Sequence, residues 1–76
     1  MTYKAFRFSA HAAMRMEERS VSRREIKDAI VLGEVRKIDA RQNKFEAQRR
    51  TKRGALTVHY REGKSAIFII TVYFDS

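Results

Sequence analysis

A chain of 76 residues is long enough for one domain with a single hydrophobic core. Its composition, with 43% hydrophobic and 11% aromatic residues, favours a folded chain, and the absence of cysteine excludes disulfides and thiolate metal sites. The net charge of +8 and the sequence pI of about 10.5 favour a polyanionic partner, nucleic acid first, with an acidic protein or a membrane surface as the alternative.

The chain begins with "MTYKAFRF", which has no apolar core of the length found in signal peptides. The longest apolar run, residues 66–70, is far shorter than the ~20 residues needed to span a bilayer. We therefore expect a cytoplasmic protein without a membrane segment. Two histidines are too few for a histidine-rich zinc cluster, so we also expect no metal and no other cofactor.

The first predicted helix covers residues 9–20 and the second covers residues 23–32. Ser9 suits the N-cap of the first helix because its hydroxyl accepts a hydrogen bond from a free N–H of the first turn. Ser22 and Glu25 have the spacing of a capping box at the start of the second helix. Gly33 suits the end of that helix because glycine adopts a positive φ at little cost.

After this glycine the pattern changes to the two-residue alternation of strands, which we predict at residues 34–40, 44–50, 55–61 and 66–74. The connectors between these strands are short, polar and supplied with glycine, and so favour antiparallel hairpins. The predicted fold class is α+β. In it, one domain over residues 1–76 packs two N-terminal helices on one face of a four-stranded, mainly antiparallel meander sheet.

A tight turn at "REGK" fixes the predicted register of the last hairpin. It places His59 on the face of Val72, and Tyr60 on the face of Thr71 and Tyr73, whereas a slip of one residue would exchange the two sets. Histidine and tyrosine side chains on a sheet face can transfer protons; the alternative is that both tyrosines are ordinary strand residues with hydrogen-bonded hydroxyls. Thr71, the polar residue of an apolar strand, either faces a ligand or is simply a good strand former.

Within the first helix, His11, Arg15 and Arg19 recur every four residues and therefore share one face. Imidazole acts as an acid or a base near neutral pH, and guanidinium binds phosphate through two parallel hydrogen bonds. RNA cleavage needs such groups: a base for the 2′-hydroxyl, an acid for the leaving oxygen and cations for the developing charge. The alternative is a solvated row in which Glu18 pairs with Arg15 or Arg19.

Three quarters of the net charge lies in residues 36–53, here called the basic segment, which holds eight Lys or Arg residues and two acidic residues. Lys and Arg would contact phosphates there without reading the base sequence, and a solvated hairpin is the alternative. We predict that the segment binds nucleic acid, with RNA as the expected partner. The predicted contact residues are Arg36, Lys37, Arg41, Lys44, Arg49, Arg50, Lys52 and Arg53.

The N-terminal half of the chain resembles the opening of the domain of unknown function 4258 family. The residues that carry this resemblance are Phe8, Ser9, His11, Ala12, Arg15, Met16, Glu18, Arg19, Gly33 and Glu34. The strands resemble the end of the same family, through Leu56, Val58, Tyr60, Ile70, Thr71 and Tyr73. The resemblance covers nearly the whole chain, and its N-terminal motif is the more specific part.

That family is similar to the wider RelE/ParE/BrnT-like toxin superfamily, whose members often cleave RNA or poison gyrase and are neutralised by an antitoxin protein. The resemblance thus implies a RelE-like two-layer fold, a toxin of bacterial or phage origin, and an acidic antitoxin as a partner. It also implies a catalytic site, in which Glu18 orients an arginine or joins the proton transfer. The site residues implied are His11, Arg15, Glu18, Arg19, Thr71 and Tyr73.

The first hypothesis is therefore a metal-independent ribonuclease toxin. In it His11 acts as base or acid, Tyr73 or His59 is its counterpart, and the two arginines of the helix stabilise the phosphorane. The second hypothesis is a non-catalytic module that binds nucleic acid through the basic segment. The third is an interaction protein whose last strand, residues 66–74, pairs with a partner chain.

Overall fold

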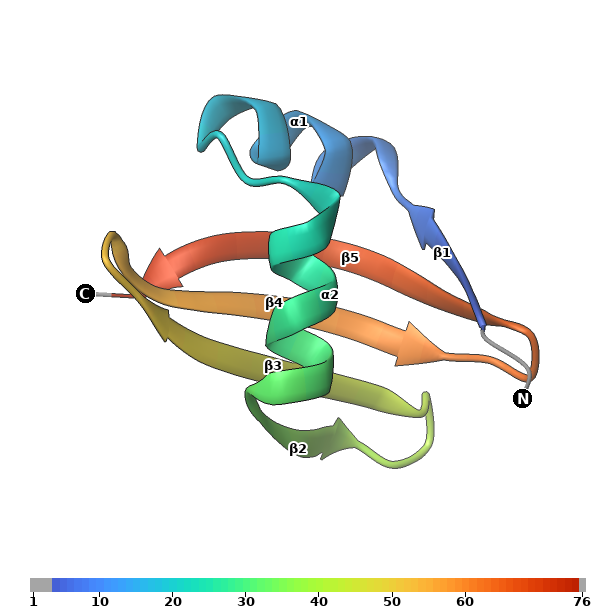
Figure 1. Cartoon of the computed structure of the whole chain (residues 1–76). Helices are drawn as coiled ribbons and strands as arrows, with labels where there is room; N and C mark the ends of the chain where they lie inside the picture. Colours follow the sequence, from blue (N-terminus) through green and yellow to red (C-terminus); the bar gives the residue numbers. More distant parts are fainter. Residues whose placement is uncertain (1–3, 76) are drawn as a thin grey trace.

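Two helices lie on one face of a five-stranded sheet in the computed structural model, which describes residues 4–75 (Figure 1). The elements are β1 (Ala5–Phe8), α1 (Ala10–Glu18), α2 (Arg23–Leu32), β2 (Glu34–Asp39), β3 (Lys44–Thr51), β4 (Gly54–Glu62) and β5 (Ala66–Asp75). The predicted α+β class, with two helices packed on a mostly antiparallel sheet, is confirmed. Neither of these helices is long and apolar enough to cross a membrane.

The sheet has the strand order β1-β5-β4-β3-β2, and its last four strands form the predicted antiparallel meander. The fifth strand is a correction to the predicted four. β1 pairs in parallel with β5, from Ala5 opposite Ala66 to Phe8 opposite Ile69, and its Phe6 and Phe8 side chains pack against the core. Because the partner of β1 lies at the other end of the chain, no local hairpin pattern indicates this short strand.

Both predicted helix starts are confirmed by their caps. The Ser9 hydroxyl accepts a hydrogen bond of 2.9 Å from the Ala12 N–H at the start of α1. At the start of α2, the Ser22 N–H donates to the Glu25 carboxylate at 2.9 Å and the Glu25 N–H donates to the Ser22 hydroxyl at 3.1 Å. These contacts satisfy backbone donors that the first helical turn leaves free.

Gly33 ends α2 as predicted, but for a different reason. Its φ is −84°, a conformation that any residue adopts, so positive φ plays no part. A Cβ atom at this position would lie 2.4 Å from the carbonyl oxygen of Ala29 and 2.4 Å from that of Gln48. Glycine is needed here because the end of α2 lies against the backbone of β3.

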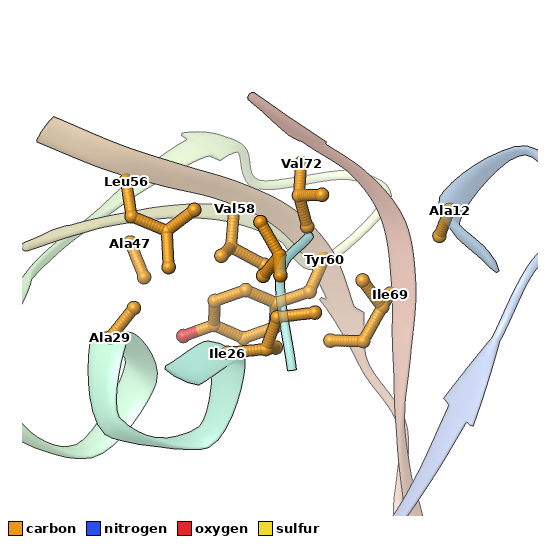
Figure 2. Packing of buried hydrophobic residues seen from close by; sticks show 10 residues of the cluster. Ala12, Ile26, Ala29, Ala47, Leu56, Val58, Tyr60, Ile69 and Val72 are labelled. Carbon is orange, nitrogen blue, oxygen red and sulfur yellow. The ribbon is translucent and has the colours of Figure 1, made fainter. Parts of the chain in front are cut away.

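The core lies between the two helices and one face of the sheet, which we call the helix face (Figure 2). α1 contributes Ala12, and α2 contributes Ile26 and Ala29, all fully buried. The strands contribute Ala47, Leu56, Val58, Tyr60, Ile69 and Val72. The opposite face of the sheet, which neither α1 nor α2 covers, is called the open face (Figure 1).

A β-bulge changes the register predicted for the last hairpin. Tyr60 pairs with Ile69, whereas the preceding residue, His59, pairs with Thr71, so Ile70 is an additional residue in β5. The extra residue breaks the simple alternation of side chains between the two faces. The predicted register, in which the turn at "REGK" sets Tyr60 opposite Ser65, is wrong from its first pair, and the bulge also exchanges the two faces beyond Ile70.

The bulge decides which side chains occupy the open face. Tyr60 and Val72 both point into the core, with only 3% and 0% of their surface exposed. Thr71 and Tyr73 flank Val72 in β5 and therefore lie on the open face with His59. The predicted placement of His59 with Val72, and of Tyr60 with Thr71 and Tyr73, is wrong, because the bulge exchanges the faces of the β5 positions after Ile70.

Candidate active site

The predicted row on α1 lies at the protein surface. His11 and Arg19 are exposed and Arg15 is half-buried. Nη1 of Arg15 donates to Oε1 of Glu18 at 3.1 Å, with 38% and 51% of the two side chains exposed. An exposed pair of this kind contributes only ~0.3–0.5 kcal/mol to stability. This ion pair is the one that the solvated alternative predicts.

The structure separates this row from Thr71 and Tyr73. α1 packs its buried Ala12 into the core on the helix face, while Thr71 and Tyr73 lie on the open face. Among residues 4–75, no hydrogen bond or ion pair joins the two groups. The six predicted catalytic residues are therefore not brought together, and their catalytic roles stay predictions.

Four polar side chains instead form a continuous line across the open face. Arg36 pairs with Glu46 between β2 and β3, Glu46 with His59 between β3 and β4, and His59 with Thr71 between β4 and β5. We call these four residues the cross-strand row. Directly opposed residues on neighbouring strands have Cβ atoms about 4.5–5.5 Å apart, so their side chains meet.

Glu46 is the centre of the cross-strand row. Its Oε2 lies 2.9 Å from Nε2 of His59, and its Oε1 accepts a hydrogen bond of 3.0 Å from Nε of Arg36. The Glu46 side chain is 16% exposed and that of His59 24%, whereas that of Arg36 is 74% exposed. Arg36 thus extends from the row into solvent while the other two are largely covered.

The contacts of Glu46 fix its charge and the orientation of the imidazole. The hydrogen bond with His59 is the main cause that lowers the pKa of Glu46, and Arg36 adds to it against the opposing effect of burial. An ionised carboxylate only accepts hydrogen bonds, so Nε2 of His59 must carry the shared proton. In neutral His59, Nδ1 is then left as the base.

Tyr73 lies beside this pair. Its ring meets the His59 ring edge-on, with centroids 5.6 Å apart and an interplanar angle of 79°. Burial is the first cause that raises the pKa of Tyr73, and the negative charges of Glu46 and Asp75 raise it further, with Arg36 acting in the opposite direction. The phenol therefore stays protonated at neutral pH and is suited to donate a proton.

A hollow of about 500 Å³ adjoins the cross-strand row on the open face. It is lined by Glu34, Val35, Arg36, Glu46, Gln48, Tyr73 and Asp75. The amide of Gln48, one of these lining residues, donates to the Thr57 hydroxyl at 3.0 Å. Glu46, Tyr73 and Arg36 thus border one concave surface, and His59 lies beside it in contact with Glu46 and with the Tyr73 ring.

The comparison with protein families decides where this chain belongs. The sequence model of the family described as "Domain of unknown function (DUF4258)" matches residues 8–74, from the end of β1 to the end of β5. The chain belongs to this family. No curated protein and no solved structure matches it. The predicted family is thus confirmed, and the wider relation to RelE/ParE/BrnT-like toxins stays a prediction.

The basic segment of this DUF4258 domain does not form one surface. Arg49 faces the helices, where its Nη1 lies 3.5 Å from Oδ2 of Asp28. Arg53 has a structural role: Nη2 donates to the Glu25 carboxylate at 2.6 Å, and Nη1 donates to the Arg19 carbonyl oxygen at 2.9 Å. Arg49 and Arg53 are therefore held by groups on the helix side, and a third predicted nucleic-acid contact, Arg36, is held by Glu46.

The other cations of the basic segment divide by strand alternation. Lys37 lies on the helix face, with its ammonium 5.4 Å from the centroid of the Phe45 ring. Arg36, Lys44 and Arg50 lie on the open face, at positions that alternate with the core residues of their strands. Arg41 and Lys52 belong to the turns. The open face thus retains part of the predicted positive charge next to His59.

Glu46 is the site residue for which the sequence reasoning predicted no role. His59 was a candidate, but without its carboxylate partner. Within residues 4–75, no group of three or more His, Cys, Asp or Glu side chains has the arrangement of a metal site. The His59–Glu46 pair and the neighbouring Tyr73 phenol are groups that can transfer protons.

Proposed function

We propose that this domain is a metal-independent endoribonuclease whose reaction centre is the cross-strand row with Tyr73. The carrying observation is the Arg36–Glu46–His59 chain of contacts, at 3.0 and 2.9 Å, beside the edge-on Tyr73 ring. A histidine base oriented by a carboxylate, a protonated phenol and a fixed cation are the groups that RNA cleavage needs. The proposal moves the predicted chemistry from α1 to the open face.

In the proposed reaction, Nδ1 of His59 takes the proton of a 2′-hydroxyl, and the oxygen attacks the adjacent phosphorus. The P–O5′ bond breaks as Tyr73 donates its proton to the leaving oxygen, which gives a 2′,3′-cyclic phosphate and a 5′-hydroxyl. Glu46 stabilises the imidazolium that forms. Arg36 uses Nε for Glu46, so its terminal NH₂ groups are free to stabilise the phosphorane charge. Water then returns a proton from the imidazolium to the phenolate.

Single-stranded RNA incubated with the purified protein in EDTA tests this proposal. We expect fragments that end in cyclic phosphate, and a loss of rate of about 10²–10⁴-fold in His59→Ala and in Tyr73→Phe. His11→Gln is the matched control, because it removes an exposed imidazole from α1. Intact RNA, or a rate that depends on His11 and not on His59, would refute the assignment to the open face.

The toxin role is a further part of the proposal, and it rests on the predicted similarity to RelE/ParE/BrnT-like toxins and on the high positive charge. Induced expression in bacterial cells should slow growth for the wild-type chain and have little effect for His59→Ala. Equal inhibition by both chains at equal protein levels would show that growth is not limited by the proposed reaction.

A second candidate, an interaction module, is favoured by a different observation. The third hypothesis placed a partner on strand 66–74, but β5 lies between β1 and β4, and β1 already pairs with its residues 66–69. β2 is an edge strand, and exposed apolar residues gather on it and at the end of α2. They are Val31 (65% exposed), Leu32 (63%), Val35 (43%) and Ile38 (39%).

An extended acidic and apolar segment, such as an antitoxin tail, would fit this edge, because β2 also carries Arg36 and Lys37. A ten-residue peptide of alternating valine and glutamate is a suitable probe for NMR titration. We expect shifts of the β2 amides, weakened in Val35→Lys, and little binding of a valine–lysine peptide. Equal binding of the two peptides would remove the charge argument for an acidic partner.

A further inference from the structure

A second hollow, of about 550 Å³, lies between β1 and the first turns of α2. Its lining consists of Phe6, Phe8, Arg23, Arg24, Lys27 and Asp28. Both phenylalanines point to the helix side of the sheet, so this hollow and the cross-strand row lie on opposite sides. The two rings are only partly buried and present apolar surface to the hollow.

The charge around this hollow is positive and unneutralised. Arg23, Arg24 and Lys27 are exposed, and none of them forms an ion pair with an acidic group of residues 4–75. Asp28, the single acid in the lining, is engaged by Arg49 at 3.5 Å. Lys27 lies one helical turn from both arginines, where like charges repel each other. An anionic ligand would relieve this repulsion.

One flat group already lies against a phenylalanine ring of this hollow. The guanidinium carbon of Arg23 lies 5.1 Å from the centroid of the Phe8 ring. Phenylalanine rings and guanidinium planes are the surfaces on which unpaired bases stack in proteins that bind single strands. A phosphate ion alone would leave the two rings unused, and an uncharged aromatic ligand would leave the cations unpaired.

We infer that the hollow between β1 and α2 is a nucleotide-binding site. The base stacks against Phe6, Phe8 and the Arg23 plane, and the phosphate contacts Arg24 and Lys27. A free nucleotide and an unpaired nucleotide within a single strand offer the same chemistry. The site does not depend on the proposed cleavage, because none of its residues belongs to the cross-strand row.

NMR titration of the ¹⁵N-labelled chain with 5′-AMP, with adenosine and with inorganic phosphate tests the inference. We expect 5′-AMP to shift the amides of residues 6–8 and 23–28, and to bind at least about fivefold more tightly than phosphate, from the usual strength of base stacking on an aromatic ring. If 5′-AMP binds no more tightly than phosphate, or shifts only amides of the open face, the inference is wrong.

The double variant Arg24→Gln/Lys27→Gln should weaken 5′-AMP binding by about tenfold or more. Arg61→Gln/Lys64→Gln is the matched control, because it removes the same charge at exposed positions outside the lining of the hollow. Equal weakening in the two double variants would mean that net charge alone holds the ligand, which refutes a built site.

Phe8→Leu keeps apolar volume against the core and removes the ring. We expect this variant to bind 5′-AMP more weakly and phosphate as tightly as the wild type does. If neither ligand is bound more weakly, the base does not stack on Phe8.

A hexadeoxyadenylate strand distinguishes a free nucleotide from a nucleotide within a single strand. It has no 2′-hydroxyl, so the proposed cleavage cannot act on it. Binding at least tenfold tighter than 5′-AMP, lost in Arg24→Gln/Lys27→Gln, assigns the site to a single strand, and binding no tighter than 5′-AMP assigns it to a free nucleotide. Tight strand binding that is indifferent to these variants contradicts the site.

Discussion

Glu46→Gln is the substitution that most directly tests the cross-strand row, because it removes one charge and keeps the shape of the side chain. In the folded protein the carboxylate takes one hydrogen bond from His59 at 2.9 Å and one from Arg36 at 3.0 Å. The Arg36 side chain is 74% exposed, so its pair with Glu46 adds little. The better covered bond to His59 dominates, and we expect a loss of about 1.5–3 kcal/mol in the free energy of unfolding at pH 7.

The lowered pKa of Glu46 determines the pH range in which this loss of stability is expected. The pKa of Glu46 in the folded state lies below its ordinary value of 4.5. Its contribution to stability is therefore complete above about pH 4.5 and disappears as the pH falls through the folded-state pKa. Wild type and Glu46→Gln should differ most at neutral pH, and the difference should shrink as the pH falls below about 4.5. Glu25, whose pKa is also lowered, is present in both chains and cancels in the difference.

Urea unfolding followed by circular dichroism at a series of pH values measures this difference. Glu17→Gln is the matched control, since Glu17 is exposed on α1 and makes no ion pair within the described chain. It should change the free energy of unfolding by less than about 0.5 kcal/mol. A difference between wild type and Glu46→Gln that is the same at pH 7 and pH 3 would refute a role for the charge.

Three other predictions concern the fold and the site. Gly33→Ala should lower the free energy of unfolding by about 3 kcal/mol, because its Cβ would lie 2.4 Å from two backbone oxygens, whereas Gly63→Ala, with nearest atoms at 3.2 Å or more, should cost less than about 1 kcal/mol. Ser22→Ala should cost about 1 kcal/mol and lower Tm by about 4–8 °C in thermal unfolding, through loss of the α2 cap. In spectrophotometric titration, the Tyr73 phenolate should form above its ordinary pKa of 10.0, chiefly because of burial, and Glu46→Gln should lower that pKa.

Local chemistry explains why most of the fold is predictable from the sequence. The caps at Ser9 and Ser22 involve residues three positions apart, and both form as the spacing indicates. The strands after Gly33 are joined by short connectors, so each pairs with its neighbour in the chain. The sequence pattern and the structure both place the end of α2 at Gly33. Only the structure shows that the reason is contact with β3, which no local pattern contains.

Long-range pairing and backbone irregularity explain what the sequence does not show. β1 is recognisable only when its partner β5, at the far end of the chain, is known. The bulge at Ile70 adds one residue to β5 and thereby changes the face of every position after it. Thr71 and Tyr73 came from the resemblance as site residues. The bulge is what places them beside His59 and away from the helices.

The turn between β3 and β4 shows that the centre of the candidate site was within reach of sequence reasoning. Thr51 pairs with Gly54 across a two-residue loop, and this alone sets Glu46 opposite His59 five positions further along each strand. Helical spacing on α1 indicates only that side chains share a face, and says nothing about what lies opposite. Strand register, in contrast, identifies which residue lies opposite on the neighbouring strand. A carboxylate placed opposite a histidine by a tight turn is therefore stronger grounds for a catalytic pair than a row of like spacing on one exposed helix.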